Sequence, residues 1–195
     1  MFVRTESLRS FIRLYPIITT IIAIHILLFI GVNVIPDLLR LTAGINIYIL
    51  AGEYWRLLTP IFIHEAFPHM LFNSFSLYLF GPALERMLGK FRFIIGYLGA
   101  GVIANVATLF LQGPGYSHIG ASGAIFGLFG LYVYLIYARR DLIDQQNTQI
   151  VMTILVLSLV MTFVTPRINI LGHLFGLVGG AALGPILLMG IGKRY

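Results

Sequence analysis

The stretch FIIGYLGAGVIANVATLFLQGPGYSHIGASGAIFGLFGLYVYLIYA, residues 93–138, decides the fold because it contains no Asp, Glu, Lys or Arg. A helix needs about 20 apolar residues to cross the hydrocarbon layer of a membrane, so this stretch is long enough for two crossings. The turn sequence Gln112-Gly113-Pro114-Gly115 interrupts it near the middle. We therefore predict two membrane-spanning helices joined by a short loop.

The rest of the 195-residue chain has the same apolar character. It is 58% hydrophobic and only 10% charged, and its mean hydropathy is +0.93. Soluble domains contain about 25% charged residues, so this chain lacks the polar side chains that a water-exposed surface needs. The composition also excludes disorder, and the absence of Cys excludes a thiol nucleophile, a disulfide framework and a thiolate metal site.

Four further stretches without charged residues are long enough, alone or with a short extension, to cross a membrane. They are residues 14–36, 69–84, 145–166 and 168–192. Together with the two helices above, they predict an all-α, polytopic membrane protein. We expect a bundle of six transmembrane helices that forms a single domain over residues 1–195.

Two segments lie outside the predicted helices. Residues 37–68 form a long outer loop between the first and second helices. Within this loop, residues 41–52 are uncharged but too short to cross, so we expect them to lie at the interface or partly embedded in it. Residues 1–13 combine Arg with Phe, Leu and Ile, which is typical of a segment on the membrane surface.

Membrane topology explains the net charge of +6. If the six helices alternate in direction, most of the 13 Lys and Arg residues fall on one side of the membrane, and only Arg40, Arg56 and Arg167 fall on the other. The larger group comprises Arg4, Arg9, Arg13, Arg86, Lys90, Arg92, Arg139, Arg140, Lys193 and Arg194. The positive-inside rule then predicts that both termini are cytoplasmic, and nucleic acid is not needed as a partner to explain the charge.

A small set of polar residues lies at one level of the predicted bundle. Helices two, four and six enter from the outer face, so their first turns lie at similar depth. His69 and Asn73 are in the first turns of helix two, and Ser122 opens helix four. His173 lies about one turn into helix six. Polar groups inside spans often mark functional sites, although they also serve as hydrogen-bonding contacts between helices, which is our interpretation of His25 in helix one.

Glycines recur at short intervals in helices four and six. They are Gly120, Gly123, Gly127 and Gly130, and Gly172, Gly176, Gly180 and Gly184. Small residues at this spacing allow two helix backbones to approach closely. Close approach would bring the Ser122 hydroxyl within hydrogen-bond reach of His173, which is the geometry that activates a serine nucleophile. The spacing alone fits equally well two tightly packed helices with one buried polar contact.

The chemistry predicted for this pair is nucleophilic catalysis by a Ser–His dyad. His173 would take the proton of Ser122 during attack on a carbonyl and later return a proton to the leaving amine. His69, Asn73 and the backbone N–H of Ser122 are donors for the oxyanion, at the positive end of a helix dipole. No Asp or Glu lies in the outer half of any predicted helix, so the dyad would lack an orienting carboxylate, and the mechanism needs no metal or other cofactor.

Three other kinds of membrane protein fit the sequence less well. A zinc protease needs two His residues four apart on a helix, whereas His64 and His69 are five apart and Pro68 interrupts them. A membrane aspartyl protease needs two Asp residues inside the membrane, and every Asp of this chain falls in a predicted loop. A transporter or channel would place ionisable relays near the midplane, whereas the polar cluster here lies near one surface.

Five short motifs follow one another along the chain. They are Trp55-Arg56, His69-Met70-Leu71-Phe72-Asn73, Glu85 with Gly89, Gly120-Ala121-Ser122-Gly123, and Gly172-His173-Leu174-Phe175-Gly176 with Gly180. In this order and on these predicted helices, the set resembles the rhomboid family of intramembrane serine proteases. The resemblance covers about residues 54–184. Gly172 departs from the family pattern, in which Ala is common at this position.

The resemblance implies a role for each matched residue. Ser122 matches the nucleophile and His173 the general base, while His69 and Asn73 match residues that assist the oxyanion. Phe126, one turn after Ser122, matches an aromatic position that packs on the catalytic imidazole. Supporting roles fall to Gly120, Gly123, Gly176, Gly180, Trp55, Arg56 and Glu85, of which the last three are expected to be structural.

The resemblance also implies a substrate class and a location. A member of this family hydrolyses peptide bonds in or near transmembrane segments of membrane proteins, in a cavity open toward the outer face. Expected partners are therefore such substrates and lipids, and the compact form suits a bacterial cell membrane. Helix five, with no Gly between residues 149 and 164, and residues 165–169 are the expected gate. The alternative is a catalytically silent relative that binds transmembrane clients.

Overall fold

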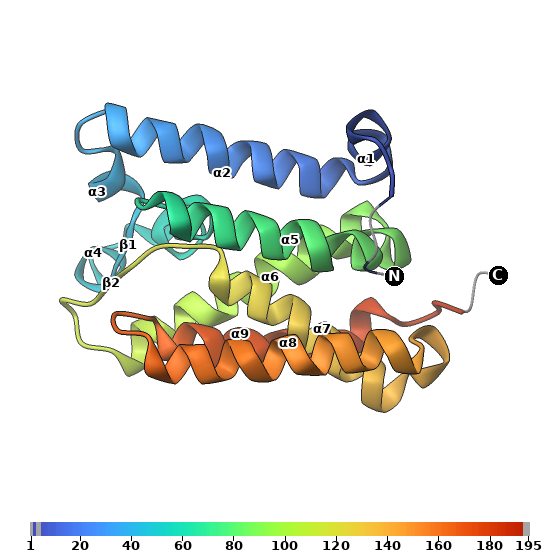
Figure 1. Cartoon of the computed structure of the whole chain (residues 1–195). Helices are drawn as coiled ribbons and strands as arrows, with labels where there is room; N and C mark the ends of the chain where they lie inside the picture. Colours follow the sequence, from blue (N-terminus) through green and yellow to red (C-terminus); the bar gives the residue numbers. More distant parts are fainter. Residues whose placement is uncertain (1, 3–4, 193–195) are drawn as a thin grey trace.

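The computed structural model of this chain describes residue 2 and residues 5–192, and its ribbon is a bundle of helices (Figure 1). Arg4, Lys193 and Arg194 of the sequence argument lie outside the described residues. The elements in chain order are α1 (Leu8–Leu14), α2 (Pro16–Val34), α3 (Leu38–Thr42), β1 (Gly44–Ile45), α4 (Asn46–Leu50), η1 (Tyr54–Leu57), η2 (Thr59–Phe62), α5 (Phe67–Leu88), α6 (Lys90–Leu111), β2 (Ser117–His118), α7 (Ser122–Ala138), η3 (Arg140–Leu142), α8 (Gln145–Val164) and α9 (Ile170–Leu187).

The long helices α2, α5, α6, α7, α8 and α9 coincide in place and order with the six predicted stretches. Four of them, α2, α6, α8 and α9, are long and apolar enough to cross a membrane. Helix α7 is apolar but has only 17 residues, and α5 has 22 residues but includes polar and charged side chains. The chain is thus an all-α bundle of membrane type, and the number of six crossings stays a prediction.

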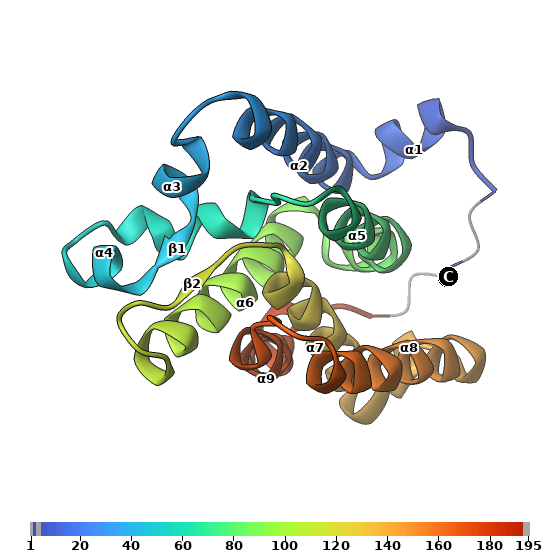
Figure 2. The ribbon, with the colours of Figure 1, turned by 60° about the vertical axis from the view of Figure 1, so that its left-hand side comes forward.

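Helix α7 lies at the centre of the bundle, with α5, α6, α8 and α9 around it (Figure 2). It is apolar on all sides, and its buried residues include Leu128, Leu131 and Tyr132. A helix of this kind belongs in a protein interior. The Tyr132 hydroxyl is satisfied by donating to the carbonyl oxygen of Phe80 at 2.7 Å, which ties α7 to α5.

The predicted glycine contact between α7 and α9 is confirmed. A methyl group at Gly176 would overlap the carbonyl oxygen of Gly123, and one at Gly180 would overlap the carbonyl oxygen of Gly127. The two backbones therefore touch at successive turns. Lipid tails are as apolar as leucine, so helices in a membrane associate through close packing of this kind and not through the hydrophobic effect.

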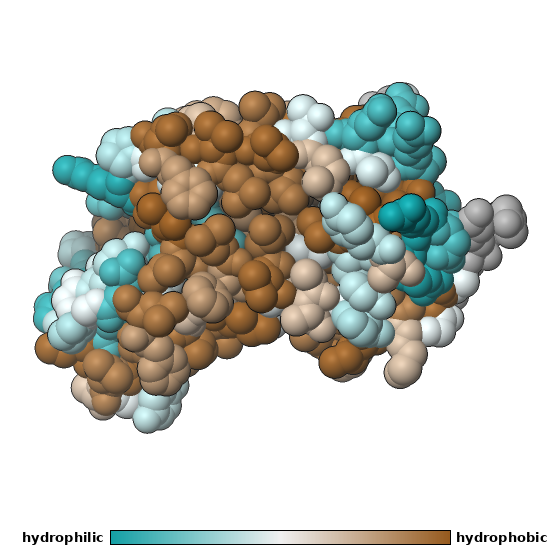
Figure 3. Space-filling view, turned by 90° about the horizontal axis from the view of Figure 1, so that it is seen from below, coloured by the Kyte–Doolittle hydropathy of each residue, from teal (hydrophilic) through white to brown (hydrophobic). Residues whose placement is uncertain are grey.

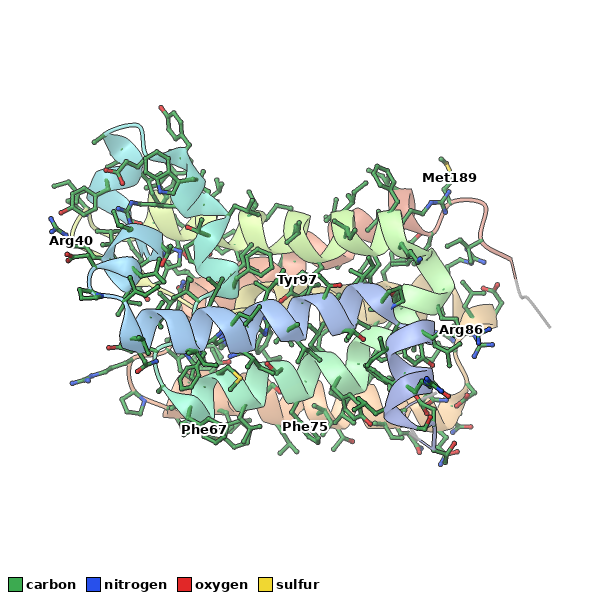
Figure 4. All side chains as sticks on the ribbon, turned by 90° about the horizontal axis from the view of Figure 1, so that it is seen from above. Arg40, Phe67, Phe75, Arg86, Tyr97 and Met189 are labelled. Atoms are coloured by element: carbon green, nitrogen blue, oxygen red, sulfur yellow. The ribbon has the colours of Figure 1, made fainter. Side chains whose placement is uncertain are left out.

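Seen from below, the bundle shows a broad apolar band between two hydrophilic ends (Figure 3). Outward side chains supply it, including Phe67 and Phe75 of α5, which point away from the bundle in Figure 4, whereas Tyr97 is fully buried within it. Helix α8 contributes Val156, Leu157, Val160, Met161, Phe163 and Val164. An exposed apolar surface of this extent is suited to lipid, in agreement with the composition.

The end of the bundle that carries α1 is rich in basic residues. Figure 4 shows Arg86 and Met189 at this end and Arg40 at the opposite one. Arg92 donates to the carbonyl oxygens of Leu187 at 3.1 Å and Met189 at 2.9 Å, which satisfies backbone groups at the end of α9. Arg92 therefore stabilises a helix end as well as adding to the charge of this face.

Glu85 makes a helix-end contact of the kind that the sequence predicts for it. Its two carboxylate oxygens accept the backbone N–H groups of Ile17 and Ile18, each at 3.0 Å. These N–H groups lie in the first turn of α2, whose N-cap residue Tyr15 gives no side-chain cap. Glu85 thus caps α2 from α5 and lies far from the polar cluster at the other end.

The long loop of residues 37–68 is a folded unit at the end opposite α1. Arg56 is only 2% exposed, and its guanidinium donates to the carbonyl oxygens of Arg40 at 2.6 Å and Ala43 at 2.7 Å and to Glu53 at 2.6 Å. Trp55 is 54% exposed. Arg56 thus clamps the loop from within, and Trp55 is largely exposed beside it; their structural roles stay predictions.

Two very short strands add to the predicted all-helical fold. Gly44 of β1 pairs with His118 of β2 in an antiparallel register. The pairing joins the long loop to the segment that leads into α7. Because lipid offers no hydrogen bonds, a non-helical segment near the membrane needs such internal partners for its backbone.

Candidate active site

A cavity of about 350 Å³ lies at the end of the bundle opposite α1. It collects residues from the long loop, from the start of α5, from the segment around β2, from the start of α7 and from the α8–α9 connection into α9. Its lining residues are Leu39, Ala43, Glu65, His69, Tyr116, Ser117, His118, Ile119, Ser122, Arg167, Ile168, Asn169 and His173. Three of the four predicted site residues, His69, Ser122 and His173, are therefore brought to one cavity.

Ser122 is the first residue of α7, and the segment before it is held in place by hydrogen bonds. The Gly120 N–H donates to the carbonyl oxygen of Pro60 at 2.8 Å, and the Ala121 N–H donates to Nε2 of His64 at 3.4 Å. Gly120 has a φ of +113°, a left-handed value that favours glycine. A side chain there would also meet the His69 ring, so this turn tolerates only glycine.

The first turn of α7 has no side-chain cap. The first four N–H groups of a helix have no partner within the helix, so the backbone N–H of Ser122 is a donor at the mouth of the cavity. The positive end of the helix dipole adds to its attraction for an anion. This arrangement can stabilise an oxyanion formed beside the Ser122 side chain.

His173 is held from two sides. Its ring stacks on Phe126, with the ring centroids 4.2 Å apart and the planes at 16°. Its Nδ1 atom is hydrogen-bonded to the Thr162 hydroxyl of α8 at 2.8 Å. Phe126 thus packs on the imidazole, as the resemblance described in the sequence analysis implies.

Ser122 and His173 line the same cavity, next to a point where the backbones of α7 and α9 touch. The next residue after Ser122, Gly123, touches Gly176, which lies one turn after His173. Within the described part of the chain, no direct hydrogen bond joins the Ser122 hydroxyl to His173. With Nδ1 engaged by Thr162, Nε2 is the ring nitrogen that remains for Ser122, and such bonds are often long before substrate binds.

Comparison with known proteins decides the family. A model of the Rhomboid domain matches residues 51–190. The chain is 44% identical, over the full length of both proteins, to the putative rhomboid protease YdcA of Bacillus subtilis (strain 168). The chain belongs to the rhomboid family.

Two longer relatives agree with this assignment. Rhomboid protease GluP of Bacillus subtilis is 39% identical over 76% of the chain, which spans 30% of that protein. Rhomboid-type serine protease 2 of Emericella nidulans is 34% identical over 68% of the chain, which spans 26% of that protein. The region shared with these longer relatives includes only part of each.

The two predicted oxyanion residues of this rhomboid are placed differently. His69 lines the cavity and lies against Gly120, next to the start of α7. Asn73 lies one turn deeper, does not line the cavity, and donates its side-chain N–H to the carbonyl oxygen of His69 at 2.8 Å. This bond lies within α5, and the Asn73 amide has one further N–H to offer.

Two residues near the site escaped the sequence reasoning. His64 was considered only as a zinc ligand, yet its ring accepts the Ala121 N–H. Burial lowers the pKa of His64 to about 3, so the ring is neutral and Nε2 can act as an acceptor. Thr162 gave no signal at all, because a single Thr in an apolar helix is ordinary. The one sequence signal for a role of His64 is its place in the same loop, five residues before His69.

The two remaining histidines, His25 and His118, are buried and make contacts that suit a structural role. His25 is buried, and its Nδ1 atom is hydrogen-bonded to the Ser74 hydroxyl at 3.2 Å, which is the structural role that the sequence predicts. His118 lies over Gly44 in the strand pair and lines the cavity. Burial lowers the pKa of His118 to about 4, which keeps this ring neutral at pH 7.

Proposed function

We propose that this rhomboid is an intramembrane serine endopeptidase in which Ser122 is the nucleophile and His173 the general base. One observation carries the assignment to these residues. Ser122, at the uncapped start of α7, and His173, on α9, line one cavity where the two helix backbones touch. The family match and the relatives named as rhomboid proteases support the class of enzyme.

The reaction proceeds in two halves. Nε2 of His173 takes the Ser122 proton while the serine oxygen bonds to the carbonyl carbon of the substrate, and the carbonyl oxygen becomes an oxyanion. As the C–N bond breaks, His173 gives its proton to the amine and an acyl-serine ester remains. Water then attacks the ester with His173 again accepting a proton, and the acid product leaves as Ser122 regains its hydrogen.

The oxyanion of each tetrahedral intermediate needs donors that are already in place. The Ser122 backbone N–H supplies one, and His69, which lies against the turn before α7, supplies a second. Asn73 supplies the third through the amide N–H that His69 does not occupy. Each such donor contributes about 10²–10³-fold to the rate.

The substrates are transmembrane segments of other proteins, cleaved close to the outer surface. Six crossings with both termini in the cytoplasm place the cavity toward the outer face, and the basic residues gathered at the α1 end support this orientation. Helix α8 with residues 165–169 serves as the gate. It lies at the edge of the bundle and exposes one long apolar side, which supports this role (Figure 2).

The direct test is cleavage of a model single-span substrate by the purified protein in liposomes, with mass spectrometry of the products. Ser122→Ala and His173→Ala should each lower kcat by about 10⁴-fold or more. A labelled fluorophosphonate should modify the wild type and not Ser122→Ala. Ser117→Ala is the matched control, because Ser117 lines the same cavity and should leave labelling and cleavage intact.

The same experiment separates the protease from a silent relative that binds transmembrane clients. A folded wild type that binds the model substrate, resists the probe and releases no products would contradict the protease assignment. Equal cleavage by wild type and Ser122→Ala would contradict the choice of nucleophile. Products cut far from the outer end of the substrate segment would contradict the orientation.

A further inference from the structure

Thr162 makes two hydrogen bonds that together determine which ring nitrogen of His173 carries the hydrogen. Its Oγ1 atom is 2.8 Å from the carbonyl oxygen of Ser158 and 2.8 Å from Nδ1 of His173. A hydroxyl has one hydrogen to donate and two lone pairs that accept. The carbonyl oxygen of Ser158 can only accept, so the Thr162 hydrogen must point to Ser158.

This arrangement leaves the Thr162 oxygen as an acceptor toward His173. The ring must then carry its hydrogen on Nδ1, because a bare Nδ1 would set two lone pairs against each other at 2.8 Å. A neutral imidazole has only one N–H, so Nε2 is bare. Both partners are shielded from solvent, with Thr162 1% and His173 8% exposed, so water does not compete for these bonds.

We infer that Thr162 is a positioning residue for the Ser122–His173 pair: it holds His173 in the tautomer whose Nε2 can accept the serine proton. The inference rests on the proposed function. It assigns to a neutral hydroxyl on α8 the orienting role for which the sequence offers no carboxylate. When His173 becomes charged, its Nδ1–H continues to donate to the same oxygen, so the bond persists through the reaction.

The location of Thr162 on α8 gives this bond a second consequence. The outer half of α8 exposes Leu157, Val160, Met161 and Val164, so Thr162 is the buried polar side chain by which this half reaches α9. An outward movement of α8 would therefore remove the acceptor of Nδ1. The tautomer that suits catalysis is then assured only when α8 lies against α9.

The test compares variants that differ by one functional group. Thr162→Val keeps the shape and removes the acceptor, Thr162→Ser keeps the acceptor, and Thr153→Val makes the same change at an exposed position of α8. In liposomes, Thr162→Val should lower kcat about 10-fold, equivalent to about 1.4 kcal/mol, with KM unchanged. Thr162→Ser and Thr153→Val should stay within about 3-fold of the wild type.

A second readout reports the tautomer without any need for activity. In ¹⁵N NMR of the protein labelled at histidine, His173 of the wild type and of Thr162→Ser should show a protonated Nδ1 and a bare Nε2. Thr162→Val should show a mixture of both tautomers. The rate of fluorophosphonate labelling should fall in parallel with kcat, because it reports Ser122 reactivity without substrate docking.

Three outcomes would overturn the inference. The first is a wild-type protein in which His173 carries its hydrogen on Nε2. This measurement needs no variant, so it tests the inference even if Thr162→Val does not fold. The second is Thr162→Val with the kcat of the wild type. The third is Thr162→Ser as impaired as Thr162→Val, since that would mean a packing role. Failure of the proposed function looks different, because Ser122→Ala would then cleave as well as the wild type.

Discussion

Replacing Gly176 by Ala tests whether the close contact of α7 and α9 sets the geometry of the site. The added methyl group would overlap the carbonyl oxygen of Gly123, which is backbone and cannot rotate away. The helices must separate by about 1 Å to restore ordinary van der Waals contact. Because Ser122 precedes Gly123 and His173 lies one turn before Gly176, this separation falls at the level of the proposed dyad.

The magnitude follows from two separate effects. Overpacking of this kind costs about 1–3 kcal/mol of folding free energy, which a bundle with many other contacts tolerates. A displacement of about 1 Å between reacting groups costs about 10²-fold in rate. We therefore expect Gly176→Ala to remain folded at low temperature while kcat for the model substrate falls about 10²-fold.

The assay combines cleavage in liposomes with thermal unfolding in detergent. Gly99→Ala is the matched control, because the new methyl group there meets only the end of the Leu183 side chain, at 3.3 Å. This control should cleave like the wild type and unfold at the same temperature or higher, since Ala favours a helix over Gly by about 1 kcal/mol. A Gly176→Ala protein with the wild-type kcat would refute the reasoning, as would equal losses in the two variants.

Three further predictions concern stability, each measured by unfolding in detergent. Arg56→Met should lower the free energy of unfolding by about 2–3 kcal/mol, because one buried and one partly buried loop carbonyl lose their donor. An unchanged value would contradict the clamp role. Glu85→Ala should cost about 1–2 kcal/mol, because Ile17 and Ile18 lose their cap. Glu85→Gln should cost less, because its amide oxygen can still accept one of the two N–H groups, and equal costs for the two variants would contradict this account. Burial lowers the pKa of His118 from 6.5 to about 4, so the unfolded chain binds the proton first as the pH falls. The contribution of this ring to stability should therefore be complete above pH 6.5 and should fall as the pH drops toward 4. His118→Gln should reduce this pH dependence of the unfolding free energy, and an identical dependence in the variant would contradict the assignment.

The large features of the fold were predictable because they repeat along the chain. Long uncharged stretches locate the helices, since lipid admits few charges, and glycines at every fourth residue of the last helix predict its backbone contact at Gly176 and Gly180. The polar residues of the candidate site were predicted from their depth in the bundle. Ser122 and His173 start or nearly start helices that enter from the same side, and the structure brings both to one cavity.

The features that were missed depend on single contacts between distant residues. The pairing of Gly44 with His118 involves two-residue strands, which have no periodicity to detect. Thr162 and His64 acquire their roles only from what they face, the His173 ring and the Ala121 N–H. Neither partner can be deduced without knowing the rotation of α8 or the path of the long loop.

The short length of α7 has a consequence for the choice of the bond that is cut. Its 17 residues span about 25 Å, less than the hydrocarbon thickness of about 30 Å. At its far end, Arg139 is bound to the carbonyl oxygen of Leu188 at 3.2 Å, so the helix is anchored there. In the proposed orientation, α7 would hold Ser122 at a fixed depth measured from the inner surface. A thicker bilayer would then present a different residue of the same substrate segment to the proposed nucleophile.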